Sequence, residues 1–200
     1  MKKYVMLLLA ALLLVCAMQI VQDQRELAAK LVRLHVVANS DSQTDQAVKL
    51  QVRDAVLDQV QNLTAGCTDQ AQTVAVLQEH LSSLQRTASE TLARAGSGDT
   101  ARVRLCRERF PTRLYPTFSL PAGEYTSLRV ELGKAGGQNW WCVVFPTLCT
   151  AAQSQDMQAI AAASGFDDRQ IAMICQTEEY EIDFKLLEVL EKVRELFAAP

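Results

Sequence analysis

The segment from Asn139 to Cys149 holds the side chains best suited to recognition. It reads Asn-Trp-Trp-Cys-Val-Val-Phe-Pro-Thr-Leu-Cys, with two adjacent tryptophans and a cysteine near each end. Neighbouring side chains of a strand point to opposite faces, so one tryptophan enters the core and the other faces outward or into a second layer. An exposed tryptophan is a frequent interface anchor. We therefore predict that Trp140 and Trp141 take part in partner binding, the alternative being that they pack under a covering helix.

The two cysteines of this segment, Cys142 and Cys149, are candidates for a disulfide. A continuous strand would hold them roughly 23 Å apart, but Pro146 and Thr147 offer a place for the chain to reverse. In an oxidising compartment, closing this small loop would contribute on the order of 2 to 3 kcal/mol. We predict the disulfide, with two buried thiols as the alternative. Five of the six cysteines lie beyond residue 21, so at least one thiol stays free or pairs between chains.

Other reactive side chains give little support for catalysis. Structural zinc usually takes four closely spaced Cys or His ligands, whereas the sequence has two histidines, His35 and His80, and no short cysteine pair. The motifs of an activated serine, a phosphate-binding glycine loop or a paired-histidine helix are absent from the sequence. We predict no catalytic residue, no metal, no cofactor and no small-molecule substrate, and hence a protein that is not an enzyme.

Five arginines follow one another closely in the middle of the chain, with one acid among them. On a strand, Arg102 and Arg104 would share one face, and Arg107 and Arg109 the other. They are either solvated or paired with the acidic C-terminal helix, or they contact an acidic partner or anionic lipid headgroups. The net charge of −3 and the sequence pI of about 5.5 argue against nucleic acid as a partner.

Strongly periodic elements must position these side chains. Residues 31–38 alternate and predict a half-buried strand, with Arg33 and His35 on one face and aliphatic side chains on the other. An amphipathic helix is predicted over residues 44–63.

The turn between this strand and helix is polar. Ser42 and Asp45 resemble a capping box, although Glu or Gln is the usual residue at the third helical position. Asn39 and Asp41 either cap the helix or bind a partner, and the sequence does not separate the two roles.

The remaining elements complete an α+β fold, a single domain with a mostly antiparallel sheet covered by amphipathic helices. The glycine pair 136–137 suggests a hairpin between the two strands on either side of it. The predicted helices are 68–95, 151–163 and 181–198, and the predicted strands are 101–110, 123–133, 139–145 and 171–175.

The N-terminus has the pattern of an export signal. Lys2 and Lys3 precede an uncharged run over residues 4–17, and Ala17 suits a cleavage site. Extended to Val21, the run is barely long enough for an uncleaved anchor, and a buried core helix is a third explanation. We predict that residues 1–21 form a signal peptide or membrane anchor and that residues 22–200 form the exported domain.

Several segments resemble the stage II sporulation protein R family. Residues 33–42 read Arg-Leu-His-Val-Val-Ala-Asn-Ser-Asp-Ser, and residues 45–57 continue the resemblance. Residues 115–125 contain Leu-Pro-Ala-Gly-Glu-Tyr, and residues 139–149 contain the Trp-Trp-Cys motif. Residues 184–189, Phe-Lys-Leu-Leu-Glu-Val, close the domain. Together these segments cover most of the predicted exported domain.

The resemblance implies a signalling protein. Family members are made in the forespore and exported into the space between it and the mother cell. There they activate a membrane-embedded aspartic protease of the mother cell, which processes pro-sigma-E. A secreted hydrolase of the cell envelope and a structural envelope protein are the alternative functions.

Overall fold

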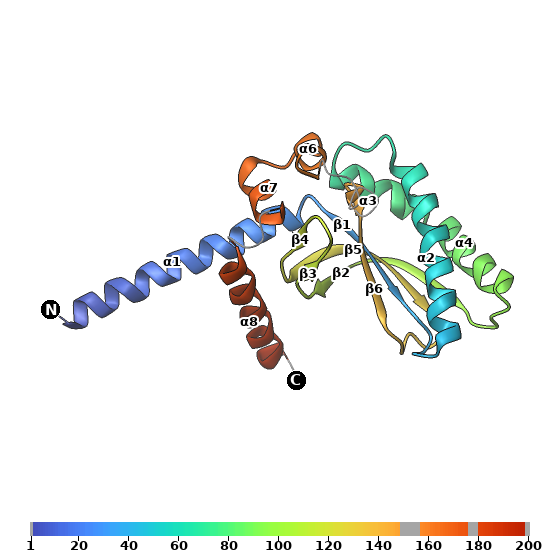
Figure 1. Ribbon diagram of the computed structural model, residues 1–200, viewed down its shortest axis with the longest axis horizontal. Coiled ribbons are helices and arrows are strands. Elements are labelled where there is room, and N and C mark those ends of the chain that lie inside the picture. Colours follow the sequence, from blue (N-terminus) through green and yellow to red (C-terminus); the bar gives the residue numbers. More distant parts are fainter. Residues whose placement is uncertain (1, 149–156, 176–179, 199–200) are drawn as a thin grey trace.

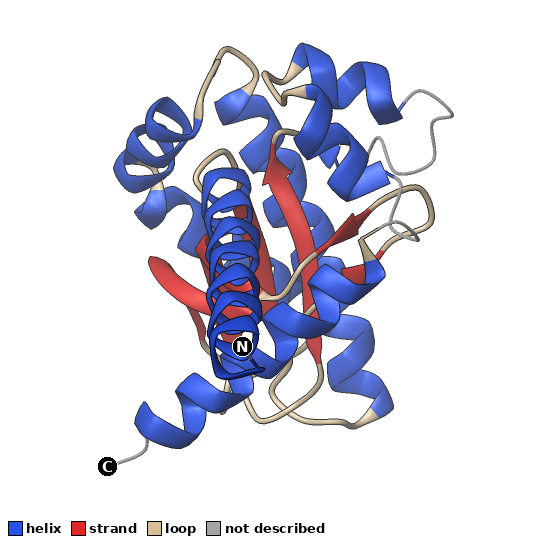
Figure 2. Cartoon of the chain, turned by 90° about the vertical axis from the view of Figure 1, so that its left-hand side faces the viewer, coloured by secondary structure: helices blue, strands red, loops and turns tan. Residues whose placement is uncertain are grey.

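The computed structural model describes residues 2–148, 157–175 and 180–198. One four-stranded sheet carries helices on both faces (Figures 1 and 2). Its central pair of strands is parallel and its two outer pairs are antiparallel, which confirms the prediction of an α+β domain with a mostly antiparallel sheet. The strand order is β2 (Ala101–Phe110), β5 (Gly123–Leu132), β1 (Val32–Val37) and β6 (Asn139–Phe145).

The predicted hairpin around Gly136 and Gly137 is wrong, because β1 lies between β5 and β6. All six residues of β1 are buried, so this strand needs cover on both faces and a neighbour on each side. The loop after β5 crosses the end of β1, where Gly136 N–H donates to the carbonyl of Asn39 and Gly137 N–H to that of Ala38. The glycines therefore allow a close crossing and make no reversal between paired strands.

Three helices cover one face of the sheet: α2 (Gln43–Thr64), α3 (Gln70–Glu79) and α4 (Leu81–Arg94). The predicted single helix over 68–95 is wrong, because it breaks at His80. The break lets α3 reach β1 while α4 packs against α2 and β2. The main core lies between these helices and the sheet, and its fully buried members include Val52, Val56, Leu77, Leu84, Leu34 and Leu128.

A second hydrophobic cluster covers one end of the opposite face. The predicted strand 171–175 is wrong, because these residues belong to a helix whose buried members Gln170, Met173 and Ile174 follow helical spacing. Of the predicted helix 151–163, residues 157–163 are helical and the rest lie outside the described residues. The cluster includes residues of α6 (Met157–Ala163), α7 (Asp168–Cys175), α8 (Glu181–Ala198), the short strand β4 (Ser119–Leu120) and the end of α1 (Lys2–Ala28). The short strand β3 (Arg113–Leu114) pairs with β4.

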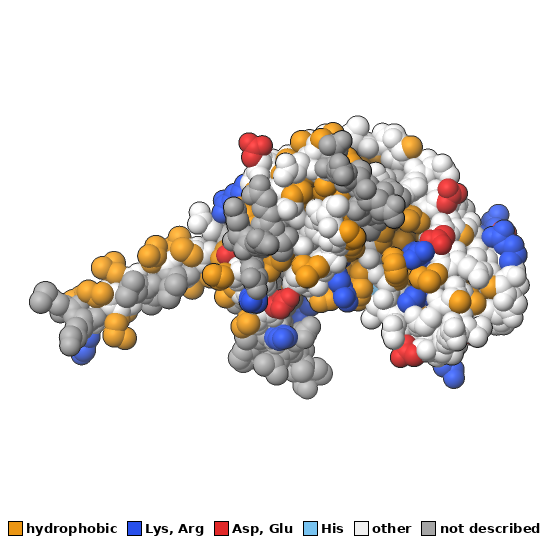
Figure 3. Space-filling view, viewed as in Figure 1, with side chains coloured by type: hydrophobic (Ala, Val, Ile, Leu, Met, Phe, Trp, Pro, Cys, Tyr) orange, Lys and Arg blue, Asp and Glu red, His pale blue; other side chains and the backbone are white. Residues whose placement is uncertain are grey.

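Most of helix α1 projects away from the domain (Figure 1). Hydrophobic side chains are exposed along it, with Leu8 71% and Met18 56% accessible (Figure 3). Burial begins near the domain, where Gln24 is 5% accessible and Leu27 is fully buried. The apolar run is therefore not a core helix. Among the described residues, no helix combines the length and apolarity needed to cross a membrane.

Candidate functional site: a partner-binding surface at the end of the sheet

The turn after β1 is tied to the loop before β6 by two side chains that were predicted to bind a partner. Asn39 Oδ1 accepts a hydrogen bond from the backbone N–H of Lys134 at 2.9 Å. Asp41 Oδ1 accepts one from the N–H of Gln138 at 2.7 Å. These contacts fix the start of β6, so the structure brings Asn39 and Asp41 to the same end of the sheet as the tryptophan pair.

The N-terminus of α2 is capped by Ser42, whose Oγ accepts the N–H of Asp45 at 3.1 Å. The prediction that Ser42 caps this helix is thus confirmed. The alternative in which Asn39 or Asp41 is the cap is wrong. Asp45 in turn accepts hydrogen bonds from Ser40 Oγ and Asn39 Nδ2, and the bond from Ser40 contributes most to lowering the pKa of this carboxyl. Partner binding by Asn39 and Asp41 stays a prediction.

Trp140 is the outward-facing member of the pair. Its side chain is 38% exposed, and the guanidinium carbon of Arg53 on α2 lies 4.2 Å from its ring centroid. Arg53 also pairs with its neighbour Asp54, with Nε 2.7 Å from Oδ1. Leu50, one turn earlier on α2, is 37% exposed. We call Trp140 and Arg53, together with the exposed Leu50 on the same helix as Arg53, the Trp140 surface; Trp and Arg are residue types that often dominate interface energies.

Trp141 points to the opposite face, as alternation along a strand requires. Its ring stacks on His35 at a centroid distance of 3.8 Å and meets Phe110 edge to face at 4.6 Å. The prediction that the two tryptophans face opposite ways, one into a core and the other outward, is confirmed, because Trp141 packs against the second hydrophobic cluster and Trp140 is exposed. The half-buried character expected for β1 is wrong, because this second layer buries Arg33 and His35 to 0% and 3% accessibility.

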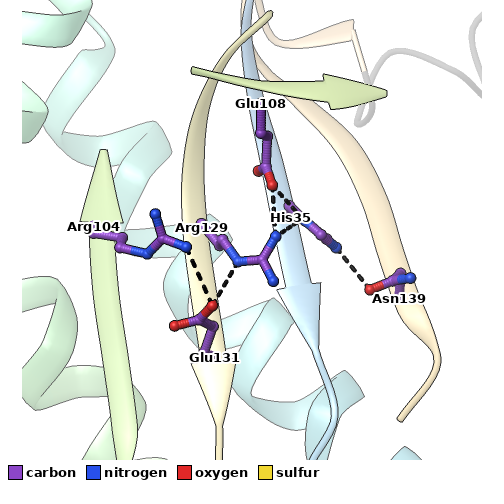
Figure 4. Close-up of polar contacts among 6 residues, drawn as sticks. All are labelled: His35, Arg104, Glu108, Arg129, Glu131 and Asn139. Atoms are coloured by element: carbon purple, nitrogen blue, oxygen red, sulfur yellow. Dashed lines mark hydrogen bonds and ion pairs between the residues drawn. The ribbon is translucent and has the colours of Figure 1, made fainter. Parts of the chain in front are cut away.

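A charged network spans the strands beside Trp141 (Figure 4). Glu108 Oε2 on β2 lies 3.0 Å from His35 Nδ1 and 2.6 Å from Arg129 Nη1. Arg129 Nε also donates to Glu131 at 2.7 Å. The second ring nitrogen of His35 lies 2.8 Å from Asn139 Oδ1, which extends the network to the first residue of β6.

Glu108 is held as a carboxylate at the centre of this network. Burial alone would raise its pKa, but hydrogen bonds that include those from His35 and Arg129 outweigh burial and lower the pKa to about 2. Glu108 Oε2 accepts a hydrogen bond from Arg129 Nη1 at 2.6 Å and lies 3.0 Å from His35 Nδ1, which is itself 3.2 Å from Arg129 Nη1. The network braces β1, β2, β5 and β6 through Glu108 Oε2, whereas Oε1 is buried and has no hydrogen-bond partner among the described residues.

The arginine cluster finds acids on the neighbouring strand. Arg104 Nη2 lies 3.3 Å from Glu131 Oε1, and Arg107 Nε lies 2.9 Å from Glu124 Oε1. For these two arginines, the alternative of pairing with the C-terminal helix is therefore wrong. The sequence did not indicate Glu124 or Glu131 because these pairs depend on the register between β2 and β5, which no local pattern reveals.

The described cysteines show no sign of an activated thiolate, and the predicted disulfide is not tested. Burial raises the pKa of the Cys106 and Cys175 thiols, which favours the protonated form over a nucleophilic thiolate. Cys142 is buried on β6, whereas Cys149 lies outside the described residues, so their disulfide stays a prediction. Within the described part of the chain, no three His, Cys, Asp or Glu side chains gather as metal ligands would.

These features define an α+β domain whose outer strand β6 carries an aromatic and cationic surface on one face and a buried charged network on the other. The model of the family described as stage II sporulation protein R matches residues 28–155. The chain belongs to this family.

A curated relative supports the assignment. Stage II sporulation protein R of Bacillus subtilis (strain 168) is 37% identical over 118 residues, which cover 59% of this chain and 53% of that protein. The match therefore spans about half of the length of this relative. No solved structure matches the chain.

Proposed function

We propose that this protein is an exported signal of sporulation. In this proposal it is made in the forespore, enters the space between forespore and mother cell, and activates a membrane-embedded aspartic protease that processes pro-sigma-E. The observation that carries the proposal is membership of the stage II sporulation protein R family over residues 28–155. The protein would act by binding, without catalysis of its own.

The first residues support export. Lys2 and Lys3 precede a run of apolar side chains that the domain leaves exposed, and such a run is the pattern of an export signal. A folded domain that begins to bury its chain at Gln24 tolerates cleavage after Ala17 or retention of the whole helix. Either product would place the same surface outside the cytoplasm.

The Trp140 surface is the proposed contact with the protease. Trp140 is held by Arg53 rather than by the core, so its ring is available without unfolding the domain. A tryptophan and an arginine together supply a large apolar area and a charge that is weakly hydrated. The turn at Asn39 and Asp41 lies at the same end of the sheet and would form the rim of the contact.

Deletion of the gene should block pro-sigma-E processing, and a copy carrying a defined cleavable signal should restore it. Immunoblotting for the precursor and mature forms checks this expectation. Normal processing in the deletion strain would favour a structural envelope protein. Turnover of peptidoglycan or peptide substrates by the purified protein, lost on replacing one cysteine or carboxylate, would favour an envelope hydrolase.

Trp140→Ala should abolish protease activation while leaving the thermal unfolding temperature within about 2 °C of the wild type, because this side chain contributes little to the core. Leu114→Ala is a matched control, since Leu114 is 73% exposed on a different part of the surface and should retain activation. A large drop in the unfolding temperature of Trp140→Ala would show that the ring supports the fold, and full activation would remove it from the contact.

A further inference from the structure

Arg33 is buried without the partner that a buried arginine usually has. Its side chain on β1 is fully inaccessible, and Nη2 donates to the hydroxyl of Tyr115 at 2.8 Å. Nε and Nη1 are buried and find no hydrogen-bond acceptor among the described residues. A guanidinium keeps its charge and offers five N–H donors, so one bond to a neutral hydroxyl leaves most of its capacity unused.

The surroundings of Arg33 stabilise a cation but supply few acceptors. The guanidinium carbon lies 4.0 Å from the ring centroid of Phe110 and 5.0 Å from that of Tyr125, which gives two cation–π contacts. Burial lowers the pKa of Arg33, and the positive charge of Arg113 lowers it further. The cation is thus desolvated beside a second cation.

Arg113, on β3, is the second member of this pair. Its Nε is buried and has no acceptor within the described chain, and its guanidinium carbon lies 5.3 Å from the ring centroid of Trp141. By contrast, Arg104, Arg107 and Arg129 each meet a glutamate on a neighbouring strand.

We propose that Arg33 and Arg113 form a recognition site for a peptide carboxylate, either an acidic side chain or a chain terminus. Arg33 is the floor of the site, and the half-buried side chains of Arg113, Tyr115 and Trp141 form its mouth. A carboxylate would replace the Tyr115 hydroxyl on Arg33 with a charge-assisted bond.

The aromatic walls favour a single negative charge with an apolar stem over a phosphate dianion, whose desolvation costs more. The site lies across β6 from the Trp140 surface. Its ligand chemistry is independent of protease activation, so either proposal can fail without the other.

Solution NMR of the full chain in nonionic detergent tests the site directly. The Nε–H signal of Arg33 should be slow to exchange because the group is buried, and it should move saturably on titration with the capped peptide acetyl-Ala-Glu-Ala-amide. The matched acetyl-Ala-Gln-Ala-amide should leave it in place. The same Gln peptide with a free C-terminus tests the terminal carboxylate as the source.

Arg113→Met should weaken carboxylate binding about tenfold or more, since it removes one of two charged donors. Arg107→Met is the control, because Arg107 is an exposed arginine paired with Glu124, and it should leave the affinity unchanged. An Arg33 signal that ignores every peptide, moves equally with the uncharged one, or responds to inorganic phosphate alone would overturn the proposal. Equal affinities in Arg113→Met and the wild type would overturn it as well.

Discussion

The most consequential side chains are charges that the fold places out of water. Glu108 joins His35 and Arg129 in a buried network, and its side chain is 15% accessible. Such groups support a fold while the full set is present and destabilise it when one member is lost. The network is therefore the first place to test whether the second face of the sheet is rigid.

Glu108→Gln should destabilise the domain by about 3 kcal/mol at pH 7, because Arg129 would keep only Glu131 as an acidic partner and the buried His35 Nδ1 would lose its contact with a carboxylate. The pKa of Glu108 is about 2 in the folded protein and 4.5 in the unfolded chain, so its stabilisation is complete above 4.5 and is lost as the pH falls toward 2. Urea denaturation at pH 7 and at pH 3 measures both effects.

Glu124→Gln is the matched control for this experiment, since Glu124 is 42% exposed in its pair with Arg107 and its loss should have little effect. If Glu108→Gln lost as much stability between pH 7 and pH 3 as the wild type does, another group would be responsible for the acid sensitivity.

At the scale of a helix or strand, the local sequence pattern predicted where the elements lie better than it predicted which elements pair with one another. The strands β1, β2, β5 and β6 and the helix α2 were all identified, because alternation and helical spacing are properties of a few adjacent residues. The order β2–β5–β1–β6 was not, since it depends on contacts between segments about a hundred residues apart.

The candidate site was predicted in part for the same reason. The outward and inward directions of Trp140 and Trp141 follow from strand geometry and were foreseen. The burial of Arg33 and His35 was not foreseen, because the aromatic side chains that contact them come from segments far apart in the sequence: Phe110, Tyr115, Tyr125 and Trp141. Arg53 and Arg129 carried no sequence signal, since their contacts lie across the fold.

The loop before β6 provides a test at this scale. A Cβ atom on Gly137 would meet the backbone carbonyl of Ser40, which has little freedom to move. Gly137→Ala should therefore cost about 1 to 3 kcal/mol of unfolding free energy by forcing the crossing apart. Gly66→Ala, where nothing lies within 4 Å, is the control and should be neutral or slightly stabilising. Equal stabilities of the two variants in chemical denaturation would contradict the close crossing.

At the scale of the whole molecule, α1 belongs to two environments. Its last turns are part of the second cluster, where Leu27 is fully buried, and Asp23 pairs with Arg169 of α7 at 2.7 Å. Its first part exposes apolar side chains that water solvates poorly. The boundary between the proposed export segment and the folded domain therefore lies inside one continuous helix.

Removal of residues 1–21 should leave the thermal unfolding temperature of the domain within about 2 °C of the full chain in nonionic detergent, because the deleted side chains make few contacts with the domain. Removal of residues 1–28 should lower it by 10 °C or more, roughly, since losing Leu27 alone would cost about 2 to 5 kcal/mol. Circular dichroism on the three forms measures the difference. A large loss in the shorter deletion would mean that residues 1–21 contribute to the folded domain, and the proposed signal cleavage would then be incompatible with a stable product.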